Sequence, residues 1–287
     1  MTNATDRTSH SARAGAPGVS APRRAAFTAL CVLGVVGATS LQAQRGNAQP
    51  APAPRAAAPF DLTGYWVSVV TMDWRWRMVT PAKGDYVGVP MTVESKKVAD
   101  TWDPAKDEAA GEQCRSYGAA ALMSVPGRLR IGWQDDRTLK VETDAGQQTR
   151  LLRFGGQPPS PPAPRSWQGD SVALWQMSRA NVPLLLRPAP RGAGSEPPAG
   201  PRYGSLRVVT TNLRPGYLRK NGVPYSANAV LTEYWDVYKR PNGEEWLTIT
   251  TEIVDPLYLR EPRLIAYPFK KEPSGAKWDP APCSSRW

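Results

Sequence analysis

From Phe60 onward, apolar and polar side chains alternate along a series of short segments, and this pattern constrains the fold more than any other feature. Such alternation is typical of β-strands that bury one face. Leu129, Ile131 and Trp133, for example, alternate with basic or small residues, and a turn signal follows at 135–137. Convincing helical periodicity over a long stretch is not found. We therefore predict an all-β domain of about eight to ten strands.

The strands are expected to form an antiparallel meander that closes into a barrel. A β-sandwich stays open as an alternative, because both folds need one buried face per strand. The plausible helix, at Ser95 to Cys114, is kept short or broken by Pro104 and Gly111. The strand candidates are 64–71, 128–133, 139–143, 149–154, 171–177, 205–212, 227–239, 246–255 and, as an edge strand, 264–270.

The first 43 residues are organised like an export signal. A polar region ends at Arg23 and Arg24, an uncharged run covers 25–41, and small residues follow. We expect cleavage near Ala43 and hence a periplasmic or secreted protein, with an uncleaved membrane anchor as the alternative. After it we expect a Pro/Ala-rich spacer at 44–59 and one β domain at 60–287, with Pro-rich loops at 157–165 and 187–202.

Removal of the signal restricts the chemistry of the mature chain. His10 is the only histidine, so its loss excludes His-based metal sites and Ser-His-Asp catalysis. Basic residues are in excess but spread along the chain, which is typical of a solvated surface and not of a nucleic-acid interface. We expect neither a cofactor, a metal nor a nucleic-acid partner. Cys114 and Cys283 remain and, in an oxidising compartment, predict a disulfide.

The mature domain is rich in aromatic side chains that have a polar tip. All eleven tryptophans and all ten tyrosines lie beyond residue 43, against only Phe60, Phe154 and Phe269. Tryptophan and tyrosine combine a large apolar face with one polar group. Two interpretations remain open: plain amphipathic packing, or a wet cavity lined with aromatic side chains.

One short motif and a wider pattern carry a resemblance to a known fold. Residues 61–66, Asp-Leu-Thr-Gly-Tyr-Trp, resemble the opening of lipocalin-like (calycin) barrels, in which the tryptophan, here Trp66, plugs one end. Together with 133–138, 149–150, 232–234 and 255–256, the chain is similar to a group of uncharacterised secreted bacterial proteins with a lipocalin-like body. The resemblance covers Phe60 to the C-terminus. It implies a barrel and an exported location, and it supplies no activity.

Glu233 is the most informative single position, because it lies on the apolar face of its predicted strand between Leu231 and Trp235. A carboxylate in such a place must be paired, protonated or directed into a cavity. One interpretation is an ion pair with an inward arginine, such as Arg150 or Arg77. The other is a buried acid in a ligand cavity, where it could serve as a general acid or base.

The segment Trp74-Arg75-Trp76-Arg77 alternates two aromatic and two basic side chains. If it is extended, one pair faces inward and the other outward. Inward arginines beneath aromatic rings would bind a carboxylate or phosphate head group through planar contacts. Outward arginines stacked on aromatic rings are the alternative.

Three functions remain open. The first is an exported lipocalin-like protein that binds a hydrophobic or amphipathic small molecule in an aromatic-lined cavity. The second is a cofactor-independent isomerase, hydratase or cyclase with Glu233 as the catalytic acid or base. The third is a protein in peripheral contact with the cell envelope, which a filled core and an exposed aromatic patch would favour. The oligomeric state is open, and the predicted ligand-binding residues are Trp66, Trp74, Arg75, Trp76, Arg77, Trp133, Arg150, Glu233 and Trp235.

Overall fold

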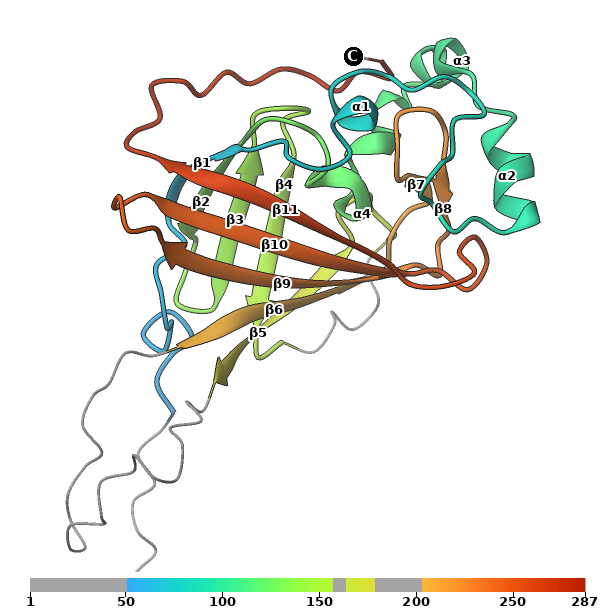
Figure 1. The fold of residues 1–287 in the computed structure, drawn as a ribbon. Coiled ribbons are helices and arrows are strands. Elements are labelled where there is room, and N and C mark those ends of the chain that lie inside the picture. Colours follow the sequence, from blue (N-terminus) through green and yellow to red (C-terminus); the bar gives the residue numbers. More distant parts are fainter. Residues whose placement is uncertain (1–50, 157–163, 179–202, 287) are drawn as a thin grey trace, which may run out of the picture. The chain divides into compact units, whose positions relative to one another are not determined.

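The computed structural model describes residues 51–156, 164–178 and 203–286. Within these ranges, nine strands close into a barrel in the order β1-β11-β10-β9-β6-β5-β4-β3-β2 (Figure 1). The all-β barrel predicted from the alternation is confirmed. The strands are β1 (Gly64–Ser68), β2 (Arg128–Trp133), β3 (Thr138–Thr143), β4 (Thr149–Phe154), β5 (Asp170–Ser178), β6 (Tyr203–Thr211), β9 (Val230–Lys239), β10 (Glu245–Val254) and β11 (Arg263–Glu272).

Strand pairing departs from the predicted meander at two places. β4 and β5 run parallel, with Leu152 opposite Ser171, whereas the other neighbours in the barrel are antiparallel. A parallel pair requires a crossover, and the long connection after Phe154 provides it. β11 is not the edge strand that we predicted. It pairs with both β10 and β1, so that it closes the barrel.

The alternation in sequence becomes alternation in burial. In β9, Leu231, Glu233 and Trp235 are buried, and the residues between them are partly exposed. β9 and β10 are joined by a tight turn at 240–244, where the φ of Gly243 is +83°. This left-handed conformation costs a glycine little, and the Asn-Gly pair in the sequence is a typical turn signal for it.

Short helices and a small hairpin lie together at one end of the barrel (Figure 1). The predicted broken helix is confirmed as two pieces, because α2 ends at Ala99 and α3 begins at Pro104. Asp103 caps α3, since its carboxylate accepts from the amides of Ala105 and Lys106. The elements are α1 (Trp74–Arg77), α2 (Val93–Ala99), α3 (Pro104–Ala109), η1 (Gln113–Tyr117), α4 (Ala119–Leu122), β7 (Gly216–Tyr217) and β8 (Pro224–Tyr225).

The described part of the barrel interior is filled with side chains. Trp66, Trp235, Leu139 and Leu206 have no accessible surface, and the indole N–H of Trp66 donates to the carbonyl of Leu62 at 2.8 Å. A cavity wide enough for a ligand would leave accessible area on its walls. These side chains have none, so the centre of the barrel is a packed core.

The disulfide Cys114–Cys283 is present, with Cα atoms 5.1 Å apart, and confirms the predicted pair. A disulfide suggests a non-reducing compartment. No helix in the described ranges has the length and apolar character needed to cross a bilayer. The predicted signal (1–43), the first part of the spacer (44–50) and much of the two Pro-rich loops lie outside the described residues.

Candidate functional site

The residues predicted to bind a ligand do not gather in one cavity. Trp66 and Trp235 belong to the packed core of the barrel. Trp133 packs against Phe154, with ring centroids 5.5 Å apart, and Phe154 in turn contacts Trp175. The remaining six residues form two separate groups of charged and aromatic side chains, one inside the barrel and one at α1.

Inside the barrel, Glu233 forms an ion pair with Arg150, as one of the two interpretations expected. Oε1 accepts from Nη1 at 3.0 Å and Oε2 accepts from Nη2 at 2.5 Å. Both side chains are 0% exposed. Nη2 also donates to the hydroxyl of Thr210, which contacts Ser171. Because both carboxylate oxygens are occupied and the pair is neutral overall, this arrangement is typical of a structural ion pair.

At α1, the predicted alternation of Trp74 to Arg77 is wrong, because these residues form a helical turn. Asp73 precedes the turn with a φ of +54°, and its carbonyl accepts from the amides of Trp76 and Arg77. A helical turn groups consecutive residues, so Trp74 and Arg75 face solvent while Arg77 is buried. The exposed Arg75 bonds Asp85 at 2.6 Å.

Arg77 leads to the candidate site, which we call the basic pocket. It is a cavity of about 20 Å³ at the helical end of the barrel, room for a water molecule or a small charged group. Four of its side chains are cationic, and they are only 3 to 7% exposed: Arg77, Arg219, Lys220 and Arg263. The pocket is lined by Asp73, Trp76, Arg77, Ser116, Ser124, Val125, Leu218, Arg219, Lys220, Arg263, Ile265 and Tyr267.

Arg77 is held in place by its neighbours but keeps part of its donor capacity. Nε donates to the carbonyl of Ser124 at 2.8 Å, and Nη2 donates to the hydroxyl of Ser68 at 3.1 Å. The guanidinium lies 5.1 Å from the ring centroid of Tyr267. Nη1 is buried and has no hydrogen-bond partner among the described residues. Because Nη1 has no accessible surface, its unused donor capacity adds to the cost of burying this guanidinium.

Arg219 and Arg263 share a single carboxylate. Asp73 lies 3.9 Å from Nη2 of Arg219 and 3.6 Å from Nη2 of Arg263. Both distances exceed that of a charge-assisted hydrogen bond. Arg219 also donates to the carbonyl of Val87 at 2.7 Å, and its guanidinium lies 4.6 Å from the ring centroid of Trp76. Asp73 therefore compensates this positive charge only in part.

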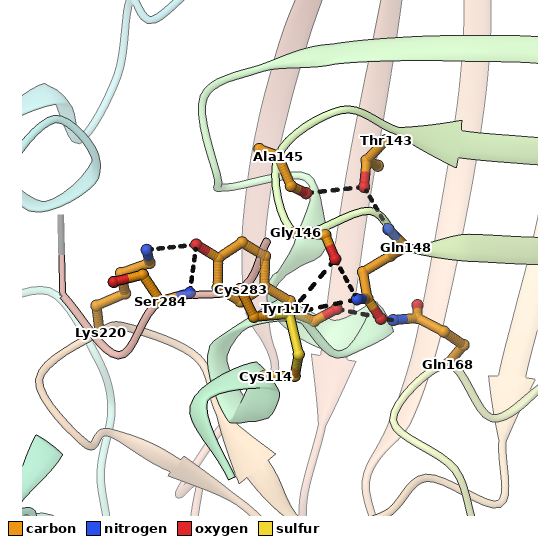
Figure 2. Close-up of a disulfide and its surroundings, with 10 residues drawn as sticks. All are labelled: Cys114, Tyr117, Thr143, Ala145, Gly146, Gln148, Gln168, Lys220, Cys283 and Ser284. Carbon is orange, nitrogen blue, oxygen red and sulfur yellow. Dashed lines mark hydrogen bonds between the residues drawn. A yellow bond between two sulfur atoms is a disulfide. The ribbon is translucent and has the colours of Figure 1, made fainter. Parts of the chain in front are cut away.

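Lys220 extends the pocket towards the disulfide (Figure 2). Its ammonium donates to the hydroxyl of Tyr117 at 2.7 Å, and the same hydroxyl accepts from the amide of Ser284 at 3.4 Å. Gly146 packs against the Tyr117 ring, where an added Cβ would lie 2.2 Å from a ring carbon. Cys283 brings the C-terminal segment to this place, so the disulfide holds one side of the pocket's surroundings.

Burial lowers the pKa values of three cations in the pocket. Burial lowers the pKa of Lys220 to about 8. Burial, reinforced by repulsion from Arg263, lowers the pKa of Arg219 to about 10. Burial likewise lowers the pKa of Arg77. Each shift means that the charged form is held at a cost, which an anion in the pocket would offset.

Sequence reasoning found Arg77 but missed Asp73, Arg219, Lys220 and Arg263. The reason is local: Arg219 and Lys220 lie in a stretch rich in turn residues, which predicts a solvated loop. In the structure every residue from 218 to 226 is buried beneath the short helices. The apolar residues Leu218 and Val223, on either side of Arg219 and Lys220, were the feature of the sequence that could have indicated burial.

The fold and the pocket define a closed nine-strand barrel whose helical end carries buried positive charge within the described residues. Comparisons of the chain with protein-family models, curated proteins and solved structures found no match. The site is therefore interpreted from its own geometry.

Proposed function

We propose that this chain is an exported, lipocalin-like binding protein for a small amphipathic molecule with an anionic group. The anionic group enters the basic pocket, and the apolar part lies outside it. The pocket admits the charged end of a ligand and not its body, because its volume is about 20 Å³.

The observation that carries the proposal is the imbalance of buried charge. Arg77, Arg219 and Arg263 lie around the carboxylate of Asp73, and the carboxylate of Asp85, which also acts on Arg219, is bound to Arg75. Buried ions are costly unless they are paired. An anion that lies among these guanidinium groups offsets that cost on binding.

Two further observations support parts of the proposal. The disulfide agrees with export to the periplasm or the exterior. The packed centre of the barrel favours a site at its end over one in its interior. The alternative of a carboxylate-based enzyme gains no comparable support, because both oxygens of Glu233 are bound to Arg150.

The experiment is isothermal titration of the mature protein with octyl phosphate below its micelle concentration, with octyl glucoside as the neutral probe of similar shape. We expect octyl phosphate to bind and octyl glucoside not to bind. Arg219→Gln should weaken octyl phosphate binding by about tenfold or more, because a charge-assisted contact contributes about 1.5–3 kcal/mol.

The matched control is Arg153→Gln, the same change at an exposed arginine on β4 outside the pocket. It should leave the affinity unchanged, as it removes one charge without touching the site. The proposal fails if both probes bind equally, if neither binds, or if the two variants lose affinity to the same degree.

A further inference from the structure

Exposed apolar side chains occur in or beside the chain segments that form the basic pocket. We call this group the apolar rim: Met72, Trp74, Met78, Val79, Val87 and Leu264, which are 50 to 67% exposed. Single exposed apolar residues are ordinary on protein surfaces, whereas a group of them marks a contact surface. Trp74 is the largest member, and 66% of it is exposed.

The rim is tied to the pocket by chain connectivity and by hydrogen bonding. Met72 and Trp74 flank Asp73, and Met78 follows Arg77. Leu264 lies between two residues that line the pocket, and its own side chain is on the outer face of β11. The carbonyl of Val87 accepts from Nη1 of Arg219. The apolar side chains and the buried cations therefore belong to one end of the molecule.

Basic residues outnumber acidic ones in and beside these segments, and four of the basic side chains are buried in the pocket. Residues 72–87 and the pocket-lining residues of the other segments contain two carboxylates, Asp73 and Asp85, both facing arginines. Against these stand six basic side chains: Arg75, Arg77, Lys83, Arg219, Lys220 and Arg263. Apolar and aromatic side chains among basic ones are the combination that anchors proteins at the interface of an anionic bilayer.

We propose that this end of the barrel docks on the surface of an anionic lipid bilayer, with the rim in the interface and a lipid phosphate in the basic pocket. The inference rests on the proposed function, because the lipid head group is the anionic group that the pocket binds. The bilayer supplies the apolar environment that the rim lacks in water, and tryptophan is well suited to the interface because its ring is amphipathic.

The experiment is flotation of the mature protein with vesicles of phosphatidylcholine alone or mixed with phosphatidylglycerol. We expect flotation with the mixed vesicles and little with phosphatidylcholine, and a loss of binding when salt is raised. The double variant Trp74→Ser/Met78→Ser should bind the mixed vesicles about tenfold less or weaker still, because two apolar side chains no longer enter the interface.

The matched control is Met177→Ser on β5, where the methionine is 46% exposed against 54% for Met78 but lies outside the rim. It should float like the unmodified protein. Arg219→Gln should also reduce flotation, since it weakens the head-group contact. Circular dichroism of each variant verifies that the barrel is folded.

The outcomes separate this inference from the proposed function. If octyl phosphate binds but the protein floats with neither vesicle, the docking surface is wrong and the small-molecule site stands. If flotation is equal for both vesicles, or unchanged in the double rim variant, the docking surface is also wrong. If neither octyl phosphate nor vesicles bind, both proposals fail.

Discussion

Two groups of buried charge among the described residues differ in balance. In the middle of the barrel, one arginine meets one glutamate, with two hydrogen bonds and no accessible surface. At the helical end, the carboxylate of Asp73 lies 3.6 Å from Arg263 and 3.9 Å from Arg219. It forms no ion pair with Arg77 among the described residues. The first group has one charge of each sign, although Nε of Arg150 has no hydrogen-bond partner among the described residues, and the second has positive charge in excess beside a cavity.

The comparison indicates which kind of buried charge is expected to bind a ligand. Burial alone does not, since Glu233 and Arg150 are the more deeply buried. What distinguishes the basic pocket is an excess of cations over carboxylates beside a cavity, where burial lowers the pKa values of Arg77 and Arg219. Departures from complete pairing are expected at functional sites.

The largest effect that tests this comparison is expected from Glu233→Gln. The substitution keeps the shape of the side chain but leaves Arg150 as an uncompensated charge in the core. We expect the free energy of unfolding to fall by about 3–5 kcal/mol. Urea unfolding followed by fluorescence measures it.

The control for this change removes both charges. The double variant Arg150→Met/Glu233→Met should recover most of the lost stability, because no isolated charge remains. Binding of octyl phosphate should persist in it. If Glu233→Gln instead abolishes binding while stability is unchanged, the pair belongs to a site and the comparison breaks.

The next largest effect is expected from loss of the disulfide. Cys114→Ser/Cys283→Ser removes a link across 169 residues of chain. We expect stability to fall by about 2–4 kcal/mol, chiefly because the unfolded chain gains freedom. Hydrogen exchange should rise around 281–286 and η1, beside the pocket, before it rises in β9. Uniform exchange throughout would show that the bond does not act locally at this end.

The barrel was predictable from the sequence because its signals are local. Alternation in 128–133 and 149–154 and the Asn242-Gly243 turn each depend on neighbouring residues. The ion pair of Glu233 was also predictable, because a carboxylate on the apolar face of a strand is costly to bury without a partner. The disulfide was predictable because only two cysteines lie beyond the predicted export signal.

The basic pocket was not predictable in the same way, because it is made by contacts between distant segments. Arg77, Arg219 and Arg263 meet only after the barrel closes through β11, which the sequence presented as an edge strand. The four-residue helix α1 is too short to show a periodic pattern. Its start depends on the left-handed conformation of Asp73, which tertiary contacts stabilise.

The smallest effect concerns Lys220 and pH. Its pKa is about 8 in the folded protein, against an ordinary value of 10.5. Above 10.5 the lysine is neutral in both states. As pH falls towards 8, the unfolded chain takes up the proton and the folded protein does not, so stability is lost. Conversely, stability from this residue rises between pH 8 and pH 10, by about 2 kcal/mol.

The pH range in which Lys220 dominates ends near pH 10, where tyrosines begin to titrate. Burial raises the pKa of Tyr117, whose hydroxyl accepts from Lys220, and it raises the pKa of Tyr217 to about 12. Stability from these tyrosines is lost as pH rises from 10 towards their pKa values in the folded protein.

The measurement is urea unfolding at pH 8 and pH 10 for the unmodified protein and for Lys220→Met. The difference between the two proteins should change by about 2 kcal/mol in favour of the unmodified one. A difference independent of pH would contradict the lowered pKa of Lys220.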